Sequence, residues 1–157
     1  RIGSTGALQP QVNIRDIVVG QGACTDSAWA TQYHLPGTFA PIADYTMLRT
    51  CVETAEQLGL PYHVGNLLSS DRFYGDDGDM PDGWKANNAW AKMGVLAVEM
   101  EAAALYMNAA RAGKRALAIC TVSDQLVRQE FTTSEERQTG FTQMMQLALE
   151  TAIKLEK

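Results

Sequence analysis

An apolar run over residues 115–122 constrains the fold of this chain more than any other segment. Its sequence, Arg-Ala-Leu-Ala-Ile-Cys-Thr-Val, does not alternate between polar and apolar residues as a half-exposed strand does. A run of this kind is typical of a strand that is buried on both faces of its sheet. Helices must then cover both faces, so the run predicts a layered α/β fold.

Strand and helix patterns alternate along the rest of the chain. β-branched and apolar residues bounded by turn residues predict strands over residues 14–19, 62–68 and 95–98. Helices are expected over residues 44–58, 88–92, 101–112 and 133–155. Asp44 can cap the first of these helices, and Gly59 suits its end. Thr133 and Glu136 have the spacing of a capping box before the last.

These elements indicate an α/β fold with a mixed central β-sheet flanked by helices in three layers. The chain has 157 residues, enough for one hydrophobic core, and no repeat or linker divides it, so we expect a single domain over residues 1–157. Residues 1–6 and 22–41 are expected to be irregular. The first of these segments has the composition of a loop that usually follows a strand, and no Met precedes it. We therefore expect the chain to lack the N-terminal portion of its domain.

The composition argues against several classes of function. The net charge is -5 at pH 7, so no nucleic-acid-binding surface is expected. No apolar run approaches the length that spans a bilayer, and no signal peptide is visible. Cys24, Cys51 and Cys120 lack metal-type spacing and are interpreted as buried, reduced thiols of a cytoplasmic protein. The acidic loop expected over residues 75–83 lacks the order of a calcium-binding loop, so no metal site is expected.

Functional side chains follow the ends of several predicted strands. Residues 71–74, Asp-Arg-Phe-Tyr, follow one strand, Glu99-Met100-Glu101 follow another, and Ser123-Asp124 follow the apolar run. Ligands of α/β folds bind at the carboxyl ends of strands, so we expect these side chains to lie close together. A carboxylate beside a hydrophobic core needs a partner, and the hydroxyls of a sugar would supply one. The alternative is that Glu99 and Glu101 form the solvated first turn of a helix.

Asp124 has the position of a general acid, provided that partial burial raises its pKa. Arg128 and Arg137 lie downstream and are candidate partners, but pairing with either would lower that pKa. The alternative is an ordinary aspartate that begins a turn.

The opening segment, with Arg1 and Ser4, combines a guanidinium, hydroxyls and backbone N–H groups that suit an oxyanion such as phosphate. The alternative is a plain turn with a frayed Arg1. Phe73 offers an aromatic face for a base, with core packing as its alternative. His34 and His63 have no partners at useful spacing and are interpreted as structural or surface residues.

Several segments, in order along nearly the whole chain, resemble the bacterial, hexameric type of purine nucleoside phosphorylase within the nucleoside phosphorylase and nucleosidase superfamily. The most specific are Val-Glu-Met-Glu-Ala-Ala at residues 98–103 and Thr-Val-Ser-Asp at residues 121–124. The others lie at residues 1–6, 15–18, 22–27, 71–74 and 132–139.

The resemblance implies phosphorolysis, in which a purine nucleoside and inorganic phosphate give the free base and ribose 1-phosphate without a further cofactor. It also implies a cytoplasmic homohexamer, a trimer of dimers in which neighbouring subunits complete each site. In this family the aspartate protonates N7 of the purine, and an arginine swings toward it as the site closes. The implied site residues are Arg1 and Ser4 for phosphate, Glu101, Met100 and Glu99 for ribose, Phe73, Val98, Ser123 and Ser70 for the base, and Asp124 and Arg137 for catalysis.

The chain also departs from the family. The family has further chain before the arginine that matches Arg1, including a glycine and an arginine that hold phosphate. It also has a histidine and an arginine that reach a neighbouring subunit's site. It often has His where Gln125 stands. We therefore expect an incomplete phosphate site in these 157 residues.

Other readings stay open. The first ten residues are at least as similar to uridine phosphorylases, but those hold uracil with Gln and Arg on the loop that is Gly-Asp-Asp-Gly-Asp here, and they lack the Ser-Asp acid. The methylthioadenosine and S-adenosylhomocysteine nucleosidases use water instead of phosphate and lack an arginine that matches Arg1. A non-catalytic subunit or binding module is a hypothesis of a different class.

Overall fold

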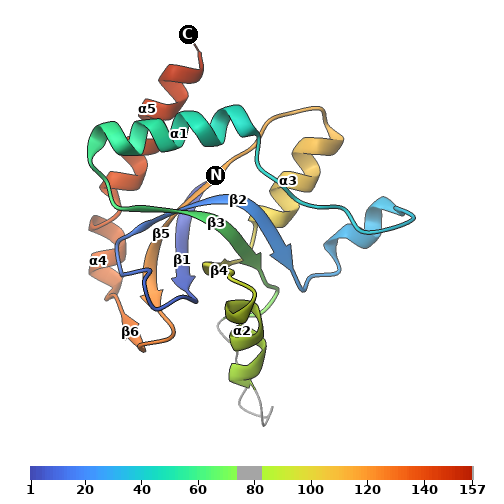
Figure 1. Ribbon diagram of the computed structural model, residues 1–157, viewed down its shortest axis with the longest axis horizontal. Helices are drawn as coiled ribbons and strands as arrows, with labels where there is room; N and C mark the ends of the chain where they lie inside the picture. The colour runs from blue at the N-terminus through green and yellow to red at the C-terminus, as the bar shows by residue number, and fades with distance from the viewer. Residues whose placement is uncertain (74–82, 157) are drawn as a thin grey trace.

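The computed structural model describes residues 1–73 and 83–156, and one mixed sheet lies at its centre (Figure 1). Its strands follow the order β1-β4-β3-β2-β5-β6, and β1 also pairs with β5, so the strands from β1 to β5 close into a ring. Their bounds are β1 Ile2–Ala7, β2 Ile17–Thr25, β3 Tyr62–Ser69, β4 Ala97–Glu99, β5 Ala118–Gln125 and β6 Glu130–Phe131. The helices are η1 Trp29–Tyr33, α1 Tyr45–Leu58, α2 Gly83–Lys92, α3 Ala102–Arg111, α4 Ser134–Thr139 and α5 Thr142–Leu155.

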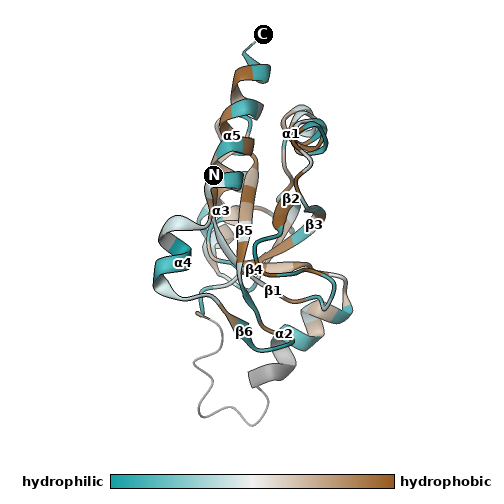
Figure 2. Ribbon diagram, turned by 90° about the vertical axis from the view of Figure 1, so that its left-hand side faces the viewer, coloured by the Kyte–Doolittle hydropathy of each residue, from teal (hydrophilic) through white to brown (hydrophobic). Residues whose placement is uncertain are grey.

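Strand β5 is buried along its whole length, which confirms the prediction from the apolar run. Its side chains alternate between two hydrophobic clusters because successive residues of a strand point to opposite faces. Ala118, Cys120 and Val122 pack with residues of α3, whereas Ile119 packs with residues of α1 and α5. The predicted three-layer arrangement is therefore confirmed. In Figures 1 and 2, α1 and α5 lie together on one side of the sheet, and hydrophobic and hydrophilic residues alternate along α5.

Local signals in the sequence place the ends of several helices. The carboxylate of Asp44 accepts a hydrogen bond from the amide of Met47 at 2.9 Å, and Gly59 ends α1 with a φ of 64°. Both features confirm the predicted bounds of α1. The capping box of Thr133 and Glu136 is also present, at the start of α4. Among the described residues, no helix has the length and apolar character needed to cross a membrane.

Tyr106 links the sheet to α3 and ties β2 to β5. Its hydroxyl donates to the carbonyl of Gly20 at 2.6 Å and accepts the amide of Ala118 at 3.0 Å, and the side chain is fully buried. We expect Tyr106→Phe to lower the free energy of unfolding by about 1–3 kcal/mol, because it leaves a buried carbonyl and amide unpaired. Urea denaturation measures this change, and a variant as stable as the wild type would contradict it.

The predicted irregular segment at the N-terminus is a strand. Residues Ile2–Ala7 pair in parallel with β5, and Gly6 and Ala7 also pair with β4. The glycines lower the local strand propensity, but pairing on both sides overrides it. Strand β2 likewise continues to Thr25, inside the predicted irregular segment 22–41, because its last residues pair with β3.

The predicted final helix is two helices, separated at Gly140. The amide of Gly140 closes α4 on the carbonyl of Glu136 at 2.7 Å, and the buried Phe141 then begins α5. A Cβ atom at residue 140 would lie 2.6 Å from that carbonyl oxygen, so only glycine fits this turn. The chain changes direction here because Phe141 packs into the cluster shared by α1 and α5.

The cysteines are free thiols, and Cys51 and Cys120 are fully buried, whereas Cys24 is only partly buried. Burial raises the pKa of Cys51 from 9.0 to about 11 and that of Cys120 to about 12. Above pH 9 the unfolded chain loses thiol protons that the folded chain keeps, so the free energy of unfolding should fall as the pH rises through the folded pKa values. Denaturation curves from pH 8 to pH 11 test this slope, and constant stability over that range would contradict it.

Candidate functional site

A pocket of about 220 Å³ brings together most of the residues that the sequence analysis selected. It opens between β1, β4 and the segment that follows β3. Its lining combines two arginines, two carboxylates, a hydroxyl and apolar side chains, as a site for a polar ligand requires. The lining residues are Arg1, Ser4, Arg72, Phe73, Val98, Glu99, Met100 and Glu101.

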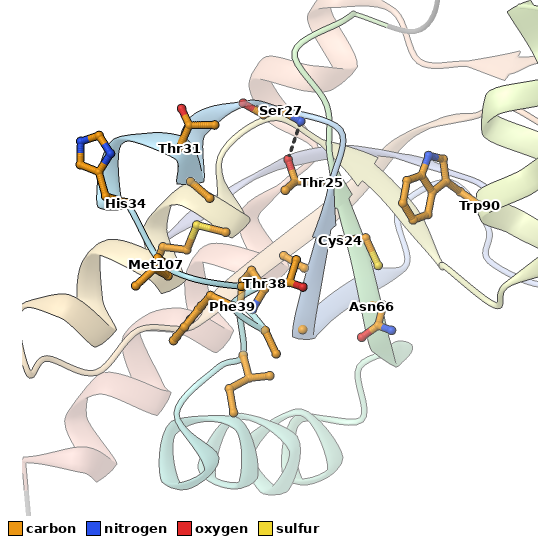
Figure 3. A pocket seen from close by; sticks show the side chains of 18 residues that line it. Cys24, Thr25, Ser27, Thr31, His34, Thr38, Phe39, Asn66, Trp90 and Met107 are labelled. Carbon is orange, nitrogen blue, oxygen red and sulfur yellow. Dashed lines mark hydrogen bonds between the residues drawn. The ribbon is translucent and has the colours of Figure 1, made fainter.

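A larger pocket of about 620 Å³ lies beside η1 and the ends of β2 and β3 (Figure 3). Residues of the segment 27–42 form much of its wall, together with Asn66, Trp90 and Met107. None of its lining residues is Asp, Glu, Lys or Arg. His34 and Cys24 are its titratable lining residues, and it has no counterpart of the arginines and carboxylates that meet in the smaller pocket, so we place the candidate site in the smaller one.

The guanidinium of Arg1 lies against the carboxylates of β4 and of the turn after it. Its Nη1 is 3.5 Å from Oε2 of Glu99 and donates to Sγ of Cys120 at 3.1 Å, while its Nη2 pairs with Glu101. Gly3 permits this packing, because a Cβ atom there would lie 2.9 Å from Nη1 of Arg1. Arg1 is thus held by side-chain contacts in the pocket that also contains Ser4, and the alternative of a plain turn with a frayed Arg1 does not fit the structure.

Glu99 and Glu101 differ in their surroundings. The carboxylate of Glu99 is buried and accepts hydrogen bonds from the hydroxyl of Ser69 and from the amides of Glu101 and Ala102 at 2.9 Å. It therefore caps the start of α3, where the helix dipole favours a negative charge. The side chain of Glu101 is 57% exposed and faces the pocket. A ribose contact remains a prediction for both, but only Glu101 has a carboxylate that is not held by backbone amides.

Asp124 is almost completely buried and has an arginine partner. Its Oδ1 lies 2.9 Å from Nη2 of Arg137, and its Oδ2 accepts the hydroxyl of Ser123 at 2.7 Å. Of the two arginines considered from the sequence, Arg137 makes this pair, and Arg128 instead pairs with Glu130 at 3.0 Å. The alternative of an ordinary turn aspartate does not fit a buried carboxylate in an ion pair.

Strand β1 relates Asp124 to the pocket. Gly6 of β1 pairs with Val98 of β4 on one side and with Asp124 of β5 on the other. Since neighbouring strands lie about 4.8 Å apart, the backbones of Val98 and Asp124 are separated by roughly 10 Å. The carboxyl ends of these strands do not all lie at the same edge of the sheet, because β5 runs antiparallel to β2 whereas β3 and β4 run parallel to it. Val98 and Asp124 nevertheless lie at the same height in the sheet, because both pair with Gly6 of β1.

The other predicted base residues lie at different depths. Val98 is buried, while Phe73 is 66% exposed on the pocket wall. Met100, predicted to contact the ribose, is 44% exposed on the same wall. The hydroxyl of Ser70 donates to Asp26 at 3.0 Å, behind the lining of the pocket. Tyr74 and the acidic loop 75–83 fall, apart from Gly83, outside the described residues.

Several contacts in this region had no signal in the sequence. His63, interpreted as a structural or surface residue, has a partner that its spacing in the sequence did not reveal, because its Nε2 lies 2.9 Å from the carboxylate of Asp16. Gln125 is fully buried, and its amide nitrogen donates to the carbonyls of Gln9 and Val12, each at 2.8 Å. Gln125, at the position where the family often has histidine, thus holds the loop after β1 in place. Thr132, which contacts Arg137, was also not selected.

The chain is similar in sequence to known proteins. The family model described as the phosphorylase superfamily matches residues 1–155. A curated protein of Tolumonas auensis named purine nucleoside phosphorylase DeoD-type is 48% identical over 153 residues. That alignment covers 98% of this chain and 62% of the relative, so the chain spans less than two thirds of the relative's length.

Proposed function

Because this chain belongs to the phosphorylase superfamily, we propose that it catalyses the phosphorolysis of purine nucleosides. The products would be the free base and ribose 1-phosphate, with inorganic phosphate as co-substrate and no further cofactor. One observation carries this proposal: Arg1 and Glu101 share a pocket that β1 links to the buried Asp124 and its partner Arg137. The name of the relative from Tolumonas auensis supports a purine as the base.

Arg1 and Ser4 would bind the phosphate. A guanidinium offers parallel N–H groups that match an oxyanion, and the Ser4 hydroxyl lies in the same pocket. Bound phosphate would replace Glu101 on Arg1, because both are anions that use the same N–H groups. Glu101 would then accept the hydroxyls of the ribose, with Met100 packed on the sugar.

Asp124 would supply the proton for the leaving base. As the bond between C1′ of the ribose and N9 of the purine breaks, the electron pair moves into the base and a proton from Asp124 binds N7. An oxygen of the phosphate forms the new bond to C1′. Nη2 of Arg137 lies 2.9 Å from Oδ1 of Asp124, so Arg137 would hold this carboxyl in place beside the base. Phe73 and Val98 would hold the base in place.

Exposed apolar residues support the proposed homohexamer. Leu35, Phe39, Ile42 and Tyr45 are 47%, 39%, 67% and 73% exposed, and the first three line the larger pocket. Several large apolar side chains exposed on one short stretch of chain fit contact with another subunit. Light scattering on the whole protein tests the proposed hexamer, and a monomer over the micromolar range would contradict it.

A comparison of nucleosides tests the base class. With phosphate present, inosine should be cleaved at least about a hundredfold faster than uridine, because uracil has no N7 to accept the proton. The absorbance change of each base measures the rates. Faster cleavage of uridine would identify a uridine phosphorylase, and cleavage of neither nucleoside would leave the binding module as the better hypothesis.

A further inference from the structure

We propose that Thr132 is a positioning residue that orients Arg137 toward Asp124. This inference rests on the proposed function and deepens it. The Oγ1 of Thr132 donates to the carbonyl of Ser123 at 2.8 Å and accepts the Nε–H of Arg137 at 3.2 Å. The same guanidinium donates from Nη2 to Asp124 at 2.9 Å. Thr132 itself is buried.

The two contacts of Arg137 fix the plane of its guanidinium. A guanidinium is rigid and flat, so hydrogen bonds from Nε and Nη2 to separate acceptors leave it a single orientation. The side chain of Arg137 is 42% exposed, and with one contact alone it would sample other rotamers. The hydroxyl proton of Thr132 is used on Ser123, so a lone pair of Oγ1 faces Arg137.

Thr132 also stabilises a β-bulge in β5, next to Asp124, that sets the direction of the Asp124 side chain. Thr5 pairs with Val122 and Gly6 with Asp124, so Ser123 is the extra residue of β5 at this point. Bulges of this kind redirect a neighbouring side chain and leave the extra residue outside the ladder. Both the amide and the hydroxyl of Thr132 donate to the carbonyl of Ser123, at 3.1 and 2.8 Å. One residue thus supports both members of the Asp124–Arg137 pair.

The consequence is specific to the protonation of the base. Thr132 does not line the pocket that holds Arg1 and Glu101, so its loss should leave phosphate and ribose binding unchanged. It should slow only those substrates whose base needs a proton. Inosine is such a substrate, whereas 7-methylinosine carries a methyl group on N7 and leaves as a neutral base without protonation.

The test compares Thr132→Val and Thr132→Ser with the wild type, on the whole protein. Thr132→Val is expected to lower kcat for inosine about tenfold, the effect of losing one hydrogen bond to a charged group. The KM for phosphate and kcat for 7-methylinosine should stay within about twofold of wild type. Thr132→Ser keeps the hydroxyl and should restore most of the rate. Thr132→Ala is a second variant that introduces no additional methyl group.

Thr121→Val is the matched control. Thr121 is buried in the same strand as Asp124, and its Oγ1 has no hydrogen-bond partner within the described part of the chain. The same substitution there should leave both rates unchanged. In Thr132→Val the backbone amide still donates to the carbonyl of Ser123, so the bulge is kept and the substitution acts through Arg137. A double variant with Arg137→Met should therefore be no slower than Arg137→Met alone.

Equal rates of Thr132→Val and wild type with inosine would overturn the inference, as would equal losses with inosine and 7-methylinosine. An additive double variant would also overturn it. If the wild type itself cleaves neither nucleoside, the proposed function fails and this inference with it. That outcome is seen before any variant is compared.

Discussion

Asp124→Asn is expected to lower kcat for inosine phosphorolysis by about 10²–10⁴-fold, the usual contribution of a general acid. The amide can hydrogen bond to N7 of the purine but cannot release a proton to it at neutral pH. The buried position of Asp124 and its contacts with Ser123 and Arg137 leave room for an isosteric amide. Steady-state rates at saturating phosphate measure the effect, and the KM for phosphate should change little.

The control for this variant is Asp16→Asn. Asp16 is also a buried carboxylate in a side-chain pair, but its partner is His63, and neither residue has a proposed role in binding or catalysis. Asp16→Asn should lower the free energy of unfolding and leave kcat for inosine near the wild-type value.

Asp124→Asn should also cleave 7-methylinosine nearly as fast as the wild type does. A mutant that is fully active on inosine would remove Asp124 from the role of acid.

Glu99→Ala is expected to lower the free energy of unfolding by about 3–5 kcal/mol, the usual effect of breaking a buried charge pair. The carboxylate is 1% exposed and pairs with Arg1. Its removal also leaves the hydroxyl of Ser69 and the first amides of α3 without their acceptor. Denaturant unfolding of the variant and the wild type measures the loss.

Glu101→Ala provides the matched comparison. Its carboxylate is more than half exposed, so the substitution should change stability by less than about 1 kcal/mol. It should instead raise the KM for inosine, since Glu101 is the proposed acceptor for the ribose hydroxyls. The opposite pattern, with an unstable Glu101 variant and a stable Glu99 variant, would contradict the structural role of Glu99 and the ribose-binding role of Glu101.

Much of the fold was predictable where local chemistry decides the structure. The apolar run over residues 115–122 identified the central strand, and Asp44, Gly59 and Thr133 marked helix ends. Residues 2–7 were not predictable as a strand, because their pairing with β4 and β5 is a tertiary contact that their own composition does not encode. The break at Gly140 likewise depends on where Phe141 packs.

The residues of the site could be predicted from the sequence, but most of the hydrogen bonds and ion pairs between them could not. Arg1, Phe73 and Glu101 were chosen from the sequence, and one pocket contains all of them. The partner of Asp124 was one of two candidates, and only the folded structure distinguishes Arg137 from Arg128. The roles of Ser69 and Thr132 were missed, because a hydroxyl in a sequence gives no sign of which distant group it meets.

Phosphorus NMR of the whole protein with inosine and phosphate tests the central claim most directly. The account predicts that the inorganic phosphate signal falls as a ribose 1-phosphate signal rises, in equal amounts with hypoxanthine, and that no base forms when phosphate is left out. Hypoxanthine released together with free ribose, at a rate that does not depend on phosphate, would contradict the account and identify a hydrolase.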